Sequence, residues 1–214
     1  MKVLVACEYS GRVRQAFRDR GHDAWSCDLL ESEDNSPYHI QGYVDGLLEQ
    51  PWDLVVAHPP CTYLCNSGVR WLYPRKTLQP DLFELDRVRR RWELMRDGAL
   101  FFVDCLQANS PRVAVENPVM HKYARKVIED HYRHPEPWSW FSVQPWQFGD
   151  PAKKRTCFWT RGLPPLQPTS TMTASDAKAD CHLASPGPDR WKERSRTYKG
   201  IAEAIADQWG SLSP

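Results

Sequence analysis

The stretch KVLVACEYSGRVRQAFRDRGHDAWSCD, residues 2–28, decides the fold. Residues 2–6 form a short apolar run that predicts a buried strand, and residues 23–27 predict a second strand, which Asp28 closes. Between the two strands, apolar residues recur at helical spacing until Gly21 ends the helix. A strand, a turn, a helix and a strand in this order are typical of a βαβ unit in a parallel sheet.

The alternation of strands and helices continues along the rest of the chain. Further strands are expected at 53–57, 112–115, 138–141, 145–148 and 155–160. Further helices are expected at 81–108, 119–132 and 199–209, and loops at 30–43 and 62–80. We therefore predict an α/β fold with a doubly wound, mostly parallel sheet, in which residues 1–214 form one domain and 161–195 an irregular excursion.

The composition is that of a soluble globular protein without a strong net charge. Lys+Arg is 28 and Asp+Glu is 27, so the net charge of +1 excludes a polycation, and nucleic-acid binding would need a local basic surface. A solvated helix face is the first interpretation of the arginines at 87 and 89–91, and a phosphate-binding patch is the second. Most of the ten tryptophans are expected in the core, with base stacking as the alternative.

The seven cysteines include no CxxC pair, and no apolar run has the length of a signal peptide or a membrane span. These features predict free thiols, a reducing cytoplasm and no contact with a membrane. The pair Cys181-His182 has no further ligands at the spacing of a zinc site, so no metal is expected.

Four short motifs come directly after predicted strands, at residues 7–11, 28, 58–61 and 116–118. In doubly wound sheets, ligands bind in the crevice outside the carboxyl ends of the strands. We therefore expect these four motifs to converge on one site.

Cys61 ends the segment His58-Pro59-Pro60-Cys61, in which two prolines stop the strand and stiffen the loop. A cysteine thiolate is a strong nucleophile once its pKa is lowered, and this position faces the expected cleft. A buried structural cysteine is the alternative. A cysteine hydrolase with His58 as its base is less favoured, because the sequence names no partner for that histidine.

Glu116 lies at the end of a buried strand, in the segment Glu116-Asn117-Pro118. Burial would raise the pKa of this carboxyl group, so that it carries a proton for catalysis; a capping or ion-paired glutamate is the alternative. The turn at 7–11 lies at a helix start, where nucleotide-like cofactors contact backbone amides, and Asp28 stands where an acid meets ribose hydroxyls.

With these motifs in this order, the chain resembles the DNA (cytosine-5)-methyltransferases, especially the short versions found in bacteriophages and prophages. The resemblance rests on the Pro-Pro-Cys of 59–61 and the Glu-Asn of 116–117, and it covers nearly the whole chain except 161–195. It implies the Rossmann-like fold of S-adenosylmethionine-dependent methyltransferases and a monomeric enzyme that acts on DNA in the cytoplasm of a bacterial host.

The resemblance also implies roles for individual residues. Cys61 would add to carbon 6 of cytosine and Glu116 would hold the proton on N3, while carbon 5 takes a methyl group and leaves S-adenosylhomocysteine as the product. The residues implied to hold the substrate are Pro60, Asn117 and Pro118. Those implied to hold the cofactor are Glu8, Tyr9, Ser10, Gly11 and Pro59, with Asp28 at the ribose and Asp45 at the adenine amine.

Two segments bear on the substrate. The family carries a Gln-x-Arg-x-Arg pattern whose arginine contacts the base, and here Lys154 or Arg155 is expected to make that contact. Residues 161–195 stand where the family carries its target-recognition domain, and they are too few for an independent domain. Residues 197–206, which follow, resemble the family's closing helix motif.

Three hypotheses about the substrate follow from the short excursion. The first is methylation of cytosine at short or degenerate sites in DNA. The second is action on single-stranded DNA or free cytosine nucleotides, and the third is an inactive protein that only binds cofactor or DNA. The presence of both Cys61 and Glu116 favours an enzyme.

Overall fold

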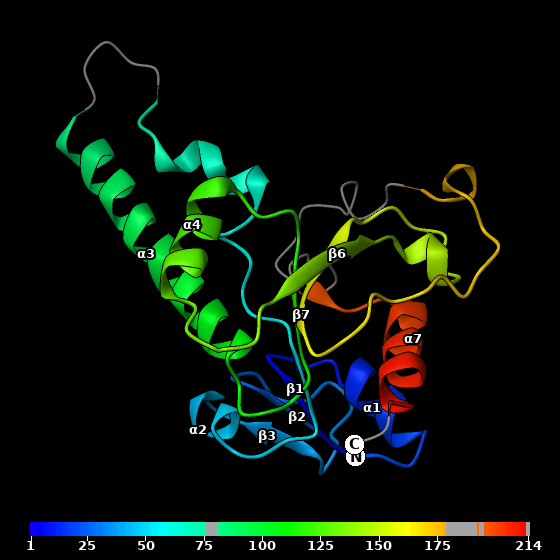
Figure 1. Ribbon diagram of the computed structural model, residues 1–214. Helices are drawn as coiled ribbons and strands as arrows, with labels where there is room; N and C mark the ends of the chain where they lie inside the picture. The colour runs from blue at the N-terminus through cyan, green and yellow to red at the C-terminus, as the bar shows by residue number, and fades with distance from the viewer. Residues whose placement is uncertain (76–80, 179–191, 193–194, 213–214) are drawn as a thin grey trace.

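A seven-stranded sheet runs through the protein (Figure 1), whose computed structural model describes residues 1–75, 81–178, 192 and 195–212. The strand order is β3-β2-β1-β4-β5-β7-β6. Strands β1 to β5 pair in parallel, and β7 runs antiparallel to both of its neighbours. The strands are β1 Lys2–Ala6, β2 Asp23–Asp28, β3 His39–Gln41, β4 Leu54–Ala57, β5 Val113–Asn117, β6 Ser139–Val143 and β7 Thr156–Arg161.

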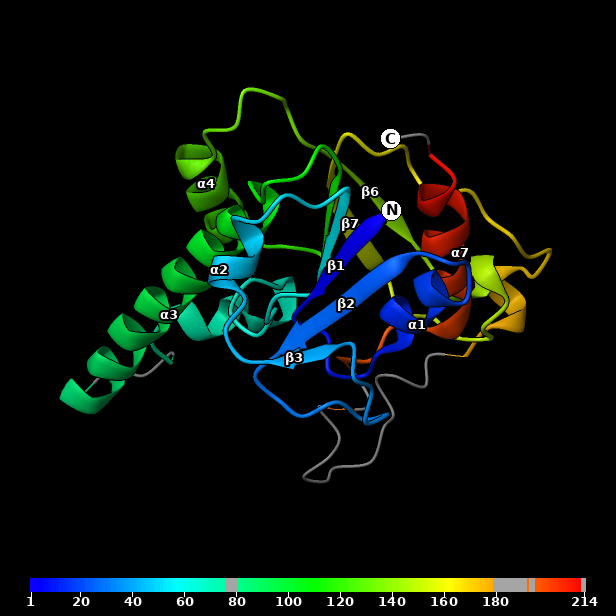
Figure 2. The same ribbon diagram turned by 90° about the horizontal axis from the view of Figure 1, so that it is seen from below.

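Helices cover both faces of the sheet (Figure 2). One face carries α2 (Asp45–Leu48), α3 (Leu82–Leu106) and α4 (Lys122–His131), and the opposite face carries α1 (Arg12–Arg18) and α7 (Lys199–Gly210). Three short 3-10 helices complete the described elements: η1 (Asn66–Leu72), η2 (Pro145–Phe148) and η3 (Ala174–Asp176). This arrangement is doubly wound, and the strand order reverses between β1 and β4.

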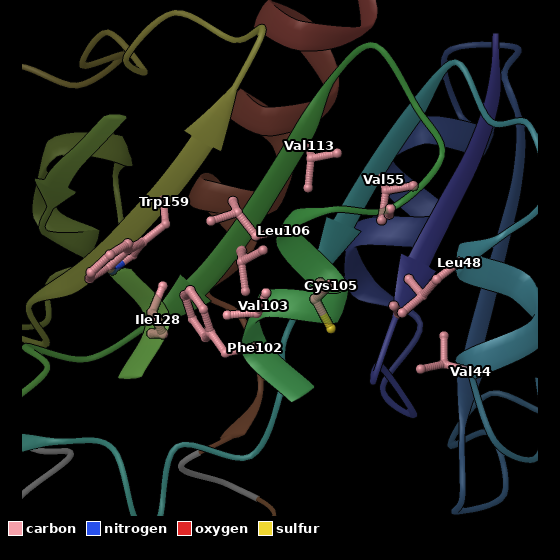
Figure 3. Close-up of a cluster of buried hydrophobic side chains, with 14 of the residues drawn as sticks. Val44, Leu48, Val55, Phe102, Val103, Cys105, Leu106, Val113, Ile128 and Trp159 are labelled. Carbon is pink, nitrogen blue, oxygen red and sulfur yellow. The ribbon is translucent and has the colours of Figure 1, made fainter. Parts of the chain in front are cut away.

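Two apolar cores lie on the two faces, because successive residues of a strand point to opposite sides. Val55 and Val113 pack against the last turns of α3, where Phe102 and Leu106 are fully buried (Figure 3). On the other face, strand residues pack against α1 and α7, whose Trp209 is fully buried. The continuous burial of β1 and β4 on both faces explains why their sequences are apolar runs.

The expected fold class is confirmed: an α/β protein with a doubly wound, mostly parallel sheet. The central strands and the helices over 82–106 and 199–210 lie where the sequence predicts them. Assignment of 1–214 to one domain stays a prediction.

Three predictions of local structure are wrong. The loop expected at 30–43 contains β3, a three-residue edge strand without a buried residue, so no apolar run marks it. The segment 145–148 is η2 rather than a strand, because Pro145 begins it and the side chains of Gln144 and Gln147 cap each other's backbone amides. The loop expected at 62–80 contains η1.

Two smaller differences concern helices. The short helix α2 was not among the predicted elements. Helix α4 begins at Lys122 rather than near 119, because the ring of His121 accepts a hydrogen bond from the amide of Ala124 at 3.1 Å and caps the helix there. In the excursion, residues 161–178 carry the end of β7, η3 and extended segments, whereas Cys181-His182 lies outside the described residues.

Candidate active site

The register of the parallel strands brings the four sequence motifs into one row at the carboxyl edge of the sheet. Ala6 of β1 lies level with Cys27 of β2 and with Ala57 of β4, and Ala57 lies level with Val115 of β5. One residue further along each strand, the row therefore consists of Asp28, Cys7, His58 and Glu116. The row spans the point between β1 and β4 at which doubly wound folds bind ligands.

His58 and Glu116 face each other across the ends of β4 and β5. The imidazole Nδ1 of His58 lies 3.7 Å from the carboxylate Oε2 of Glu116, and the two side chains are 8% and 19% exposed. The backbone amide of His58 donates to the carbonyl of Ala6 at 2.9 Å, which extends the β1–β4 ladder by one bond. A carboxylate and an imidazole thus lie in contact where little water reaches them.

This contact determines the protonation of Glu116. Burial raises the pKa of a carboxyl group, but the contact with His58 and the positive charge of Lys154 outweigh burial and lower the pKa of Glu116 below its ordinary value. The expectation that burial leaves a proton on Glu116 is therefore wrong for the resting site. The carboxylate is ionised at neutral pH and can accept a proton.

Cys61 lies in a tight turn just beyond β4, where its carbonyl accepts from the amides of Leu64 at 3.0 Å and Cys65 at 3.2 Å. A hydrogen bond from its thiol to Cys65, together with burial, raises the pKa of the Cys61 thiol. The negative charge of Glu116 raises that pKa further, and Lys154 offsets the shift only in part. The proton therefore stays on the sulfur in the resting site.

Cys65 has the lower pKa of this pair of cysteines. The contact with Cys61 lowers the pKa of Cys65 to about 5. The hydroxyl oxygen of Ser67 lies 3.1 Å from the Cys65 sulfur and contributes to the same shift. The contact with Cys65 and the negative charge of Glu116 therefore both act on the Cys61 thiol.

Backbone hydrogen bonds join the loop after Cys61 to the loop after Glu116. The amide of Asn66 donates to the carbonyl of Val119 at 2.8 Å, and the amide of His121 donates to the carbonyl of Leu64 at 3.0 Å. Each loop therefore fixes the position of the other.

Asn117 faces the opposite side of the sheet from Glu116, because the two residues are neighbours on one strand. Asn117 is fully buried, and its Nδ2 donates to the carbonyl of Pro118 at 2.5 Å. Its Oδ1 has no hydrogen-bond partner among the residues that the structure describes. Asn117 and Pro118 shape the loop behind the carboxylate, and substrate contact by these residues and by the exposed Pro60 stays a prediction.

The two basic candidates point in different directions. Lys154 is half-buried, and its charge acts on both Cys61 and Glu116. Arg155 is exposed, and its Nε donates to the hydroxyl of Ser142 on β6 at 3.2 Å. The structure therefore brings Lys154, but not Arg155, to the cysteine and the glutamate.

The start of α7 supports the segment that carries Lys154. The amide of Gly200 donates to the carboxylate of Asp150 at 2.8 Å, and any side chain at Gly200 would overlap the carbonyl of Phe148. The ammonium group of Lys154 lies 5.8 Å from the ring centre of Tyr198. The terminal segment therefore has a structural connection to the site, as the sequence motif at 197–206 suggested.

In the first turn, Glu8 caps helix α1. Its two carboxylate oxygens accept from the amides of Val13 at 2.7 Å and Arg14 at 3.1 Å, and the side chain is buried. The hydroxyl of Tyr9 donates to the carbonyl of Lys192 at 2.9 Å. The contacts made by Glu8 and Tyr9 are thus structural, and their contact with a cofactor stays a prediction, as does that of Ser10, Gly11 and the buried Pro59.

Gly11 adopts a left-handed conformation, with φ of 68°, and an added Cβ would overlap the guanidinium of the fully buried Arg14. We expect Gly11→Ala to lower the free energy of unfolding by at least about 2 kcal/mol, since the backbone strain alone costs roughly 1–2 kcal/mol. Thermal or urea unfolding measures this loss. Gly46→Ala is the matched control, because Gly46 is exposed within α2 and nothing lies within 4 Å of the added atom; equal losses in both variants would contradict the prediction.

Two acids gather around the end of β1. Burial, together with the charges of Asp28 and Asp45, raises the pKa of the Cys7 thiol to about 12, so both carboxylates lie near this residue. Cys7 itself has a positive φ of 57°, which turns the chain away from the sheet. Leu29 and Leu30 follow Asp28 and are 58% and 37% exposed. Carboxylates beside exposed apolar side chains suit a nucleoside, which presents hydroxyls and an aromatic base.

Sequence reasoning missed the role of two residues. His58 was considered only as the base of a hydrolase, whereas in the structure it contacts Glu116. The groups that act on the Cys61 thiol are Cys65, Glu116 and Lys154. The strand register was the available signal, because His58 and Glu116 occupy equivalent positions at the ends of adjacent strands. No motif marked Cys65, four residues after Cys61.

The arginines of α3 form ion pairs along their own helix, which supports the interpretation as a solvated face. Arg87 pairs with Glu84 at 2.7 Å, and Arg89 pairs with Asp86 at 2.6 Å. Arg91 instead donates to the carbonyl of Thr62 at 3.1 Å and thereby holds the loop after Cys61.

No cluster of three metal-ligating side chains occurs in the described ranges, and the six described cysteines are free. Within the same part of the chain, no helix is long and apolar enough to cross a membrane.

No protein-family model and no curated protein sequence matches the chain. Among solved structures, it is similar to a candidate DNA modification methyltransferase encoded within an E. coli prophage, with 14% identity, a TM-score of 0.45, and 74% of this chain and 45% of that one covered. It is also similar to the Entamoeba histolytica methyltransferase EhMeth (13% identity, TM-score 0.42, 86% and 60% covered) and to Spodoptera frugiperda DNMT2 (14%, 0.41, 78% and 53%). The chain spans about half the length of the solved structures that it matches.

Proposed function

We propose that the protein is an S-adenosylmethionine-dependent methyltransferase that methylates carbon 5 of cytosine in DNA, with Cys61 as the covalent nucleophile. The observation that carries the proposal is the meeting of a thiol and an ionised carboxylate at the crevice of a doubly wound sheet, with Lys154 acting on both. The pair of acids near Cys7 supports a cofactor site in the same crevice.

The residues near Cys7 fit the cofactor chemically. Asp28 would accept hydrogen bonds from the ribose hydroxyls, and Asp45 would accept one from the adenine amine. The exposed Leu29 and Leu30 offer an apolar surface for the adenine ring. When bound, S-adenosylmethionine supplies an electrophilic methyl group.

The chain's own residues account for the movement of the proton. The Cys61 thiol loses its proton to the ionised Glu116 carboxylate, and the electron pair that remains on sulfur forms a bond to carbon 6 of cytosine. Protonated Glu116 then passes the same proton to N3, so that the ring stays neutral while carbon 5 becomes nucleophilic. Lys154 stabilises the negative charge that passes between these groups. After methylation, water takes the carbon 5 proton and Cys61 leaves carbon 6 as the thiolate. The N3 proton returns through Glu116 to the Cys61 sulfur, which restores the neutral ring and the resting site.

The test is methyl transfer from labelled S-adenosylmethionine to duplex DNA, single-stranded DNA and dCMP, followed by nucleoside analysis. We expect 5-methylcytosine in at least one of the DNA substrates. Transfer to dCMP alone would favour the nucleotide hypothesis. Cofactor binding without transfer to any of the three would rule out the catalytic proposal and favour the inactive binding protein.

A further inference from the structure

His58 is a buried histidine whose ring has no conventional hydrogen bond. Its side chain is 8% exposed, and neither Nδ1 nor Nε2 has a hydrogen-bond partner within the described residues. Its closest charged contact there is with the Glu116 carboxylate, at 3.7 Å. Burying an imidazole without hydrogen bonds is unfavourable, so its presence calls for an explanation.

The architecture holds His58 against Glu116. Parallel pairing of Ala57 with Val115 puts the next residue of each strand side by side. The alternation of side chains then directs both toward the face covered by α1 and α7, as it does Val56 and Ala114. Pro59 follows at once and prevents the strand from continuing, so the bond from the His58 amide to the carbonyl of Ala6 is the last of this ladder.

We propose that His58 is a positioning residue: its Nδ1–H points at the Glu116 carboxylate and keeps it ionised and oriented to accept the proton of the Cys61 thiol. This inference rests on the proposed function. In the step, the S–H bond of Cys61 breaks, an O–H bond forms on Glu116, and the electron pair stays on sulfur. His58 keeps its own proton throughout.

Other groups around Glu116 have to be separated from His58. Lys154 lowers the pKa of Glu116 from the segment before β7, and the thiols of Cys61 and Cys157 lie near the same carboxylate. Lys154, Cys61 and Cys157 are all retained in variants at position 58. A difference in the pKa of Glu116 between such variants therefore measures the effect of the side chain at position 58.

His58→Leu and His58→Asn form the matched pair. Asparagine carries an N–H donor close to the position of Nδ1, whereas leucine has a similar size and no donor. The carboxyl signal of Glu116 is followed by carbon-13 NMR during a pH titration and identified by its loss in Glu116→Gln. The wild-type midpoint should lie below the ordinary value of about 4.3. The midpoint should rise by at least about one pH unit in the leucine variant. In the asparagine variant it should lie between the midpoints of the wild type and the leucine variant.

Kinetics provide the second measurement. Because the ionised carboxylate is the proton acceptor, kcat/KM should fall at acidic pH, and this fall should move to higher pH in His58→Leu together with the NMR midpoint. A uniform loss of rate at every pH, without a shift, would show a merely structural role and overturn the inference. An unchanged NMR midpoint in His58→Leu would overturn it as well.

The titration also separates this inference from the proposed function. A shifted midpoint in a protein that transfers no methyl group would leave the contact between His58 and Glu116 supported and the methyltransferase proposal rejected. Methyl transfer with an unshifted midpoint would support the enzyme and reject the role of His58.

Discussion

The Cys61→Ser variant is expected to transfer methyl groups to cytosine at least about 10³-fold more slowly than the wild type, because a serine hydroxyl is a far weaker nucleophile at this position. Cys65→Ser should stay within about tenfold of the wild type, since it loses one hydrogen bond to Cys61 and no reacting atom. Initial rates with labelled S-adenosylmethionine measure both variants. The pair is matched, because the two cysteines lie four residues apart in one loop and their thiols share a hydrogen bond.

The comparison is informative because the pKa of Cys65 lies below that of Cys61. If resting charge decided reactivity, Cys65 would be the nucleophile, and the losses in the two variants would be reversed. An oligonucleotide that contains 5-fluorocytosine, incubated with S-adenosylmethionine, gives an independent measurement. Once the cysteine has added to carbon 6 and carbon 5 has been methylated, carbon 5 carries fluorine in place of a removable proton, so the covalent adduct persists. We expect the adduct in the wild type and in Cys65→Ser, and its absence in Cys61→Ser.

The parts of the fold that could be predicted from sequence are those in which burial imposes a pattern. The strands β1 and β4 are buried on both faces, so their residues are uniformly apolar, and α3 presents a regular apolar stripe to the sheet. The edge strand β3 buries no residue and therefore leaves no such signal. The aromatic segment at 145–148 is apolar enough for a strand, but Pro145 and the reciprocal caps of two glutamines favour a 3-10 helix.

The candidate site, like the fold, could be predicted from the sequence only in part. Motifs at strand ends could be read from the sequence because parallel strands deliver their ends to one edge of the sheet. The protonation of Cys61 and Glu116 could not, since it depends on a histidine 3.7 Å from the carboxylate and on a second cysteine beside the thiol. The sequence suggested a protonated Glu116, whereas the contact with His58 and the charge of Lys154 lower the pKa of this carboxyl group and keep it ionised.

The Lys154→Ala variant is expected to lower kcat/KM at neutral pH by about 10²-fold, the usual size of an effect from one charged group in a site shielded from water. Arg155→Ala should stay within about threefold of the wild type, because the side chain is exposed and its contact is with Ser142. Lys154→Arg should recover part of the activity through its charge, but not all of it, because the planar guanidinium has a different geometry. Steady-state kinetics on the preferred DNA substrate measure all three.

The pH dependence shows how Lys154 acts. Its positive charge lowers the pKa of both Cys61 and Glu116, so Lys154→Ala raises both. A higher pKa of the thiol makes its deprotonation harder at neutral pH, and the lost activity should return in part as the pH is raised. A deficit that stays constant with pH would instead indicate that Lys154 contacts the base without acting on the thiol. A larger loss in Arg155→Ala than in Lys154→Ala would contradict the assignment, because an exposed side chain bonded to β6 would then control chemistry at a cysteine that it does not reach here.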